Sequence, residues 1–102
     1  IEINDHREWT DGFNAKDIKF GYRPANVEQD WHPAPQRQFV IILSGQLQIT
    51  YPDGTKRVFG EGEARLMENI TGKGHKTMAI GDKDCLTATV VLEDQNAPIG
   101  QI

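Results

Sequence analysis

Two histidines, His32 and His75, are the residues of this sequence best suited to chemistry. His32 stands in WHPAPQRQFVIILSG, just ahead of a long apolar run, and His75 follows the glycine-rich segment TGKG. We expect each histidine to open a strand, where the two imidazoles could meet and hold an ion such as Zn, Ni, Fe or Mn. The alternative is a pair of hydrogen-bonded histidines at the mouth of a barrel, without a metal.

The segments around these histidines alternate as strands do, and no helical period persists over a convincing length. Turn sequences such as PDGT and GDKD separate runs that are rich in β-branched and aromatic residues. The expected strands are 1–3, 17–23, 37–44, 46–51, 56–59, 63–68, 75–80 and 85–92. Seven or eight short strands spaced by about 8–12 residues predict an all-β antiparallel sandwich or barrel.

Composition narrows the class of protein further. The 102 residues are predicted to form one domain, residues 1–102, and the net charge of −4 with interspersed signs argues against nucleic acid as a partner. No apolar segment approaches the ~20 residues of a membrane helix, and the segment from Glu2 is too charged for a signal peptide. The single cysteine, Cys85, excludes an internal disulfide and is expected to be a buried, unreactive thiol. We therefore expect a cytoplasmic protein with no membrane contact.

Residues 31–92 resemble the cupins, in particular the small single-domain bacterial type. The first cupin motif reads His-x-His, three or four residues, Glu, six residues, Gly. That spacing is met here by His32, Ala34, Gln38 and Gly45. The second motif ends Pro-x-Gly-x-x-His, and the segment ITGKGH keeps its glycine and its histidine. The resemblance implies an antiparallel double-stranded β-helix, or jelly-roll barrel.

The resemblance also implies a metal inside the barrel, which cupins usually hold with three histidines and one glutamate. Carried over by position, this chain keeps His32 and His75, has Gln38 in place of the glutamate, and has Ala34 in place of the second histidine. An amide oxygen is a weak, uncharged ligand. The implied site is therefore a reduced His2Gln set that leaves coordination positions open for water or substrate.

Glu68 is the acidic residue that could complete this site. Strand alternation places Glu68 on one face with Ala64 and Leu66, and their apolar character predicts that this face is internal. An internal Glu68 would be a metal ligand or a catalytic general base. If the strand ends by Met67, Glu68 lies instead on a solvated loop.

Other side chains are candidates for contact with a ligand. Trp31 either stacks on a ligand or anchors a loop at the barrel rim, and Tyr22 is a second aromatic candidate. Gln38 is expected to face the cavity. Lys73 either binds an anionic group together with the glycine-rich loop or keeps that loop soluble. Arg37 is expected to point outward, as a surface charge or in a dimer contact.

Three functions remain open from the sequence. The first is a metal-dependent enzyme of the oxygenase, isomerase or lyase class, and the second is a module that binds or senses a small molecule without metal. The third is a structural dimer with a vestigial cavity. Polar residues at cavity positions favour the first two, because buried polar groups need partners. Edge strands that need covering predict a homodimer.

Overall fold

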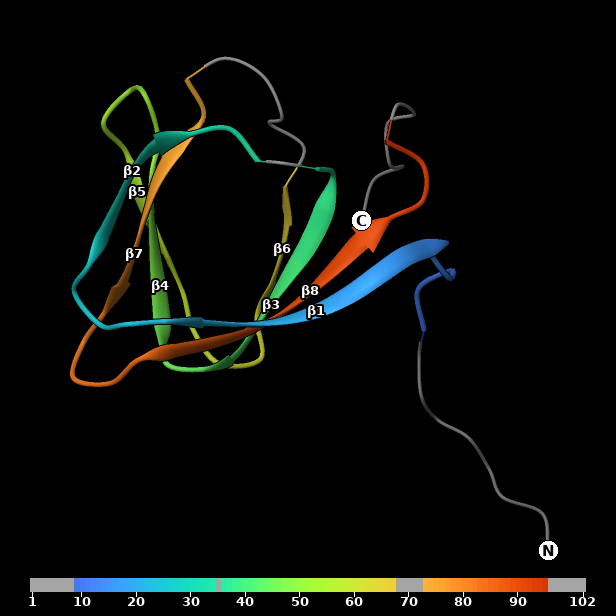
Figure 1. The fold of residues 1–102 in the computed structure, drawn as a ribbon, viewed down its shortest axis with the longest axis horizontal. Helices are drawn as coiled ribbons and strands as arrows, with labels where there is room; N and C mark the ends of the chain where they lie inside the picture. The colour runs from blue at the N-terminus through green and yellow to red at the C-terminus, as the bar shows by residue number, and fades with distance from the viewer. Residues whose placement is uncertain (1–8, 35, 68–72, 96–102) are drawn as a thin grey trace, which may run out of the picture.

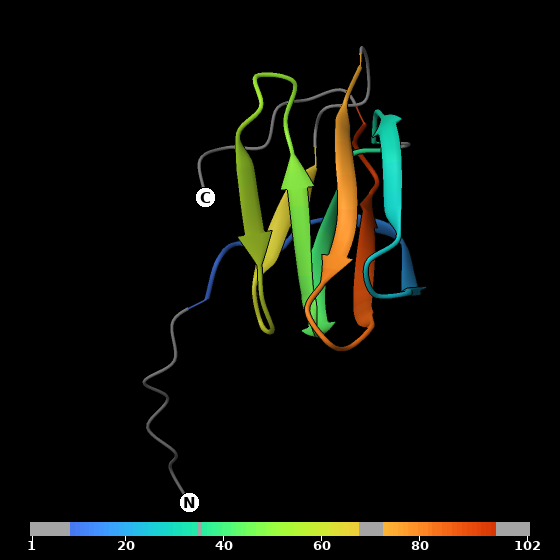
Figure 2. The same cartoon turned by 90° about the vertical axis from the view of Figure 1, so that its left-hand side faces the viewer.

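Two antiparallel four-stranded sheets face each other in the computed structural model, which describes residues 9–34, 36–67 and 73–95 (Figures 1 and 2). The strands are β1 (Ala15–Arg23), β2 (Glu28–His32), β3 (Gln38–Ser44), β4 (Gln46–Thr50), β5 (Lys56–Phe59), β6 (Ala64–Met67), β7 (His75–Ile80) and β8 (Cys85–Leu92). One sheet has the order β1-β8-β3-β6 and the other β2-β7-β4-β5. Apart from β4 and β5, paired strands are not consecutive, as in a jelly roll. The predicted all-β fold is confirmed.

Alternating side chains explain why these segments pack as two layers. In β3, Gln38, Val40 and Ile42 are buried while Phe39 and Ile41 between them are only half-buried. A strand with this period of two presents one face to the opposite sheet. The expected strands 56–59, 75–80 and 85–92 match the structure, and three others, 17–23, 37–44 and 46–51, differ by one or two residues at one end. The expected strand 63–68 begins one residue later, at Ala64, and its last residue lies outside the described residues. The expected strand 1–3 lies outside the described residues.

The strand β2 was missed by the sequence analysis. Its sequence, EQDWH, is charged, and its first three residues are exposed because β2 is at the edge of its sheet. His32 therefore ends a strand instead of opening one, and that expectation was wrong. Because β2 pairs with β7, His32 lies directly opposite His75.

Apolar side chains from both sheets form the core, in which Ile42, Ile49 and Val91 are almost fully buried. The thiol of Cys85 is also fully buried, as predicted, and burial raises its pKa. In the parts of the chain that the structure describes, no helix is long and apolar enough to cross a membrane.

Candidate ligand-binding cavity

A cavity of about 230 Å³ lies between the two sheets. Val40, Leu47 and Ile49 give it an apolar surface, which comes from the central strands β3 and β4. Polar side chains from both sheets complete the wall: Arg23, Gln29, His32, Gln38, Arg65, His75, Thr77, Thr87 and Thr89. Polar side chains of both sheets thus surround one partly open space.

The pairing of β2 with β7 brings the two histidines together. The ring centroids of His32 and His75 are 4.7 Å apart, and the rings meet edge to face at 62°. His32 Nδ1 is 2.7 Å from the carbonyl oxygen of Asp30. A neutral ring that donates its Nδ1–H to this carbonyl keeps a lone pair on Nε2.

His75 is the most unusual residue of the cavity. Its side chain is 1% exposed, and neither Nδ1 nor Nε2 has a hydrogen-bond partner among the described residues. Burial lowers the pKa of His75 to about 4, helped by the nearby charges of Arg65, His32 and Arg23. His75 is therefore neutral at pH 7, with one donor and one acceptor nitrogen that lack partners in the described parts of the chain.

Two arginines add positive charge to the cavity. Arg23 is the last residue of β1 and Arg65 lies in β6, and no carboxylate of the described ranges forms an ion pair with either guanidinium. The Arg65 guanidinium carbon lies 5.8 Å from the ring centroids of both Tyr51 and Phe59. Burial lowers the pKa of both arginines. Sequence reasoning missed both residues.

The position of Arg65 corrects the predicted orientation of β6. Arg65 and Met67 line the cavity, whereas Ala64 is exposed, so the face shared by Ala64 and Leu66 is not the one that lines this cavity. The expectation that the face of Ala64 and Leu66 lines this cavity is therefore wrong, whereas the role of Glu68 stays a prediction. Glu68 itself lies outside the described residues.

Gln38 lines the cavity beside this strand. Its Nε2 is 3.7 Å from the sulfur of Met67, the residue opposite it in the β3–β6 pair. A sulfur is a weak acceptor, so this contact uses little of the hydrogen-bonding capacity of the amide.

The other predicted ligand contacts lie outside the cavity wall. Trp31 is half-buried, and the Nζ atoms of Lys73 and Lys76 lie 4.2 and 5.3 Å from the centroid of its ring. Lys73 therefore covers Trp31 and does not line the cavity. Tyr22 is exposed, and its hydroxyl donates a hydrogen bond of 2.6 Å to Asp84.

Arg37 does not point outward as predicted. It is 5% exposed, its backbone N–H donates to the Gln95 side chain, and its guanidinium donates to the carbonyl oxygen of Asp94 at 3.0 Å. The chain that follows β8 supplies these acceptors, which the sequence pattern around Arg37 does not reveal.

The described donors do not fit a divalent metal ion. They comprise the imidazoles of His32 and His75 and the uncharged amides of Gln29 and Gln38. The described part of the chain contains no group of three or more His, Cys, Asp or Glu residues that could hold a metal. Ala34, at the position of the second family histidine, is buried and offers no ligand. Arg23 and Arg65 face the same space and would repel a cation. The metal at His32, Gln38 and His75 stays a prediction.

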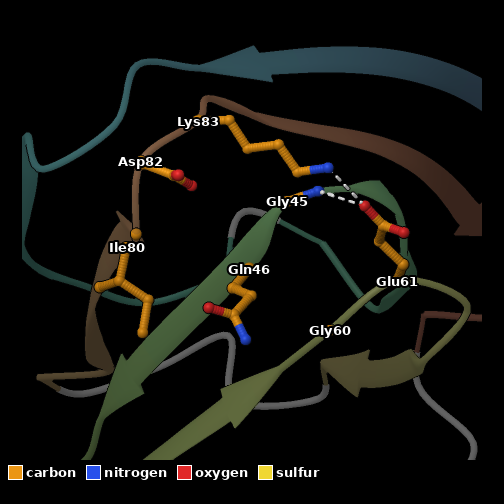
Figure 3. A pocket seen from close by; sticks show the side chains of 8 residues that line it. Gly45, Gln46, Gly60, Glu61, Ile80, Asp82 and Lys83 are labelled. Carbon is orange, nitrogen blue, oxygen red and sulfur yellow. Dashed lines mark hydrogen bonds and ion pairs between the residues drawn. The ribbon is translucent and has the colours of Figure 1, made fainter.

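A second hollow, of about 370 Å³, lies between turns at one end of the sheets (Figure 3). Its lining includes Gly45, Glu61, Asp82 and Lys83. The Glu61 carboxylate accepts hydrogen bonds from Lys83 Nζ at 2.7 Å and from the Gly45 N–H at 3.3 Å (Figure 3). In this turn hollow, the charged groups of Glu61 and Lys83 are already paired with each other, so the hollow is the weaker candidate for a ligand-binding site.

The strand order and the likeness to solved structures define the class: the chain has the cupin double-stranded β-helix fold. Comparisons with family models and with curated proteins found no match. Among solved structures, the chain is similar to the polyketide cyclase RemF from Streptomyces resistomycificus, with 18% identity and a TM-score of 0.62 over 84% of this chain and 60% of that one.

Two further structures agree with this fold. A cupin-like protein from Thermotoga maritima has 15% identity and a TM-score of 0.61, over 79% of this chain and 59% of that one. A cupin-2 domain protein from Shewanella frigidimarina has 23% identity and a TM-score of 0.56, over 87% and 85% of the two chains. The chain therefore spans about 60% of the length of the first two structures. At these identities the likeness establishes the fold, and function has to be argued from the site.

Proposed function

We propose that this protein binds a small organic molecule in the cavity between its two sheets, without a resident metal. The observation that supports this function is His75, whose two ring nitrogens are buried and lack partners among the described residues. Leaving such groups unpaired reduces the stability of the fold, by about 1–3 kcal/mol for each group. A ligand that offers one acceptor and one donor would recover this free energy.

Binding or sensing is favoured over catalysis by the contents of the cavity. Its described lining contains no carboxylate that could act as a general base, and Glu68, the candidate for that role, lies outside the described residues. A metal-dependent oxygenase, isomerase or lyase remains the second candidate. The contact between His32 and His75, with Nε2 of His32 free to bind an ion, supports that alternative.

Elemental analysis and a ligand screen on the tag-free protein separate these candidates. We expect less than stoichiometric Zn, Ni, Fe and Mn, and saturable NMR shifts at cavity residues with some members of a small-molecule library. His75→Leu should abolish those shifts, and Tyr22→Phe on the outer surface should preserve them. Stoichiometric metal that disappears in both His32→Ala and His75→Ala would favour the metalloenzyme. A library with no binder at the cavity would overturn the proposed function.

We also propose that the protein forms a homodimer through β1. This strand is at the edge of its sheet, and Ile18 and Phe20 on it are 61% and 74% exposed. An edge strand can pair antiparallel with the same strand of a second copy, which extends the sheet and covers its apolar residues. Light scattering after size exclusion should give a dimer, and Phe20→Glu should give a folded monomer. A monomeric natural protein at high concentration would contradict this.

A further inference from the structure

We propose that the ligand of this cavity is a small carboxylic acid. Its carboxylate binds to Arg23 and Arg65, and its short hydrocarbon part lies on Val40, Leu47 and Ile49. This inference rests on the proposed function and adds the chemical class of the ligand.

The placement of the two arginines on the sheet is the first observation. Arg23 and Arg65 come from β1 and β6, the two outer strands of one sheet, with β8 and β3 between them. Across the strands, three spacings separate these backbones, about 14 Å at 4.8 Å for each spacing. Along the strands, the register places Arg65 level with Lys19, four residues from Arg23. Both side chains nevertheless line the same cavity, and the Arg65 guanidinium lies near the rings of Tyr51 and Phe59.

A guanidinium that is partly removed from water is stabilised by a nearby anion. Within the described ranges, neither arginine has a carboxylate partner. The other charged or titratable groups of the described lining are His32 and His75, which supply no negative charge. The described lining therefore holds two arginine cations and no anion to balance them.

The remaining lining favours an organic acid over an inorganic anion. A guanidinium matches the planar geometry of a carboxylate and can also bind phosphate. Val40, Leu47 and Ile49, however, offer an apolar surface that a bare phosphate would leave uncovered. The volume of about 230 Å³ is below the roughly 300–1,000 Å³ typical of sites for drug-sized ligands, so the ligand has only a few carbon atoms. Hydroxyl groups of Thr87 and Thr89 can bind further polar atoms of such a molecule.

The test is an NMR titration of the dialysed, tag-free protein with butyrate and succinate. Butyramide and succinamide serve as neutral analogues of the same shape. Inorganic phosphate serves as an anion that has no hydrocarbon part. We expect saturable binding of at least one carboxylate at cavity residues, and affinity weaker by about tenfold or more for its amide. Charge-assisted hydrogen bonds have that magnitude.

Variants locate the anion. Arg23→Gln and Arg65→Gln should each weaken carboxylate binding about tenfold or more. Arg65→Lys, which keeps the charge but loses the planar fork, provides a second variant if Arg65→Gln does not fold. Lys83→Gln is the matched control, because it removes an exposed cation from the turn hollow and should leave the affinity unchanged.

The outcomes separate this inference from the proposed function. Amides that bind as tightly as the acids, or arginine variants that bind normally, would overturn the inference while leaving a ligand-binding cavity. Phosphate that binds as tightly as both acids would overturn the organic class. Carboxylate binding that is absent in the natural protein but present in Glu68→Gln would also overturn the inference. The carboxylate of Glu68 would then be the partner of the arginines, in place of a ligand. The absence of any cavity ligand, acidic or neutral, would contradict both.

Discussion

The cavity between the sheets and the turn hollow of Figure 3 both contain charged side chains, but the two regions differ in the hydrogen-bond and ion-pair partners of those side chains. In the hollow, Glu61 accepts hydrogen bonds from Lys83 and from the Gly45 backbone, and the Glu61 and Lys83 side chains are more than half exposed to water. In the cavity, His75 lacks a hydrogen-bond partner among the described residues, and neither arginine has a carboxylate partner there, although the Arg65 guanidinium interacts with the Tyr51 side chain. The free-energy cost of an unpaired polar group rises with burial. The cavity, unlike the hollow, therefore has hydrogen-bonding capacity for a ligand.

The largest effect is expected where the backbone closes tightly beside the cavity. Gly74 precedes His75, has a φ of +76°, and a Cβ atom there would collide with the backbone carbonyl group of His32. Gly74→Ala should therefore lower the free energy of unfolding by about 3 kcal/mol or more, since both backbone strain and overpacking act. Urea denaturation followed by tryptophan fluorescence measures this loss.

Gly62, beside Glu61 of the turn hollow, provides the matched control. Its φ is +83°, but a Cβ atom there would meet nothing within 4 Å. Gly62→Ala should lower the free energy of unfolding by only about 1 kcal/mol, from backbone strain alone. Equal losses in the two variants would mean that the contact between Gly74 and His32 relaxes easily, and that the two regions are equally adaptable.

The sequence pattern predicted the framework of the cavity better than its contents. Alternation and turn residues located most strands, because β3 and β8 are rich in apolar and β-branched residues between turn sequences. The charged strand β2 was missed because an edge strand with three exposed residues has no such pattern. The meeting of His32 and His75 depends on this strand, so their contact requires the register that only the structure gives.

The arginines were missed for a related reason. A binding cavity reverses the usual rule that apolar residues face inward, so in the segment ARLM the arginine lines the cavity and the alanine is exposed. Arg23 ends a strand whose other residues are all exposed, and nothing in the sequence sets it apart. Charged residues that face a functional cavity are therefore the positions at which sequence alternation misleads.

The pH dependence of stability tests the contrast between the buried groups of the cavity and the exposed charges of the turn hollow. His75 has a pKa of about 4 in the folded protein and an ordinary value of 6.5 when unfolded, so the unfolded state binds more protons between these values. The free energy of unfolding should fall by about 3 kcal/mol as the pH falls from 6.5 to 4. The groups that depress this pKa besides burial are Arg65, His32 and Arg23.

Other groups titrate in part of this range, so the measurement is a difference between two proteins. His75→Gln removes the titrating ring, and urea denaturation of both proteins over a series of pH values gives the contribution of His75. The difference in stability should shrink steadily as the pH falls toward 4, because the natural protein loses the advantage of its neutral ring. A difference that is constant over this range would show that the His75 ring is protonated as easily in the folded as in the unfolded state.

The smallest effect is expected for the ion pair of the turn hollow. The hydrogen bond from Lys83 is the main reason that the pKa of the Glu61 carboxyl is below its ordinary value, and the Gly45 N–H contributes less. Lys83→Gln should therefore raise the pKa of Glu61 in a carbon-detected NMR titration, and it should leave the midpoint of urea denaturation at pH 7 unchanged. Because both side chains are exposed, water replaces each as a partner when the other is removed. A marked loss of stability in Lys83→Gln would mean that the hollow depends on its charges as the cavity does, and would remove the contrast on which the choice of the cavity rests.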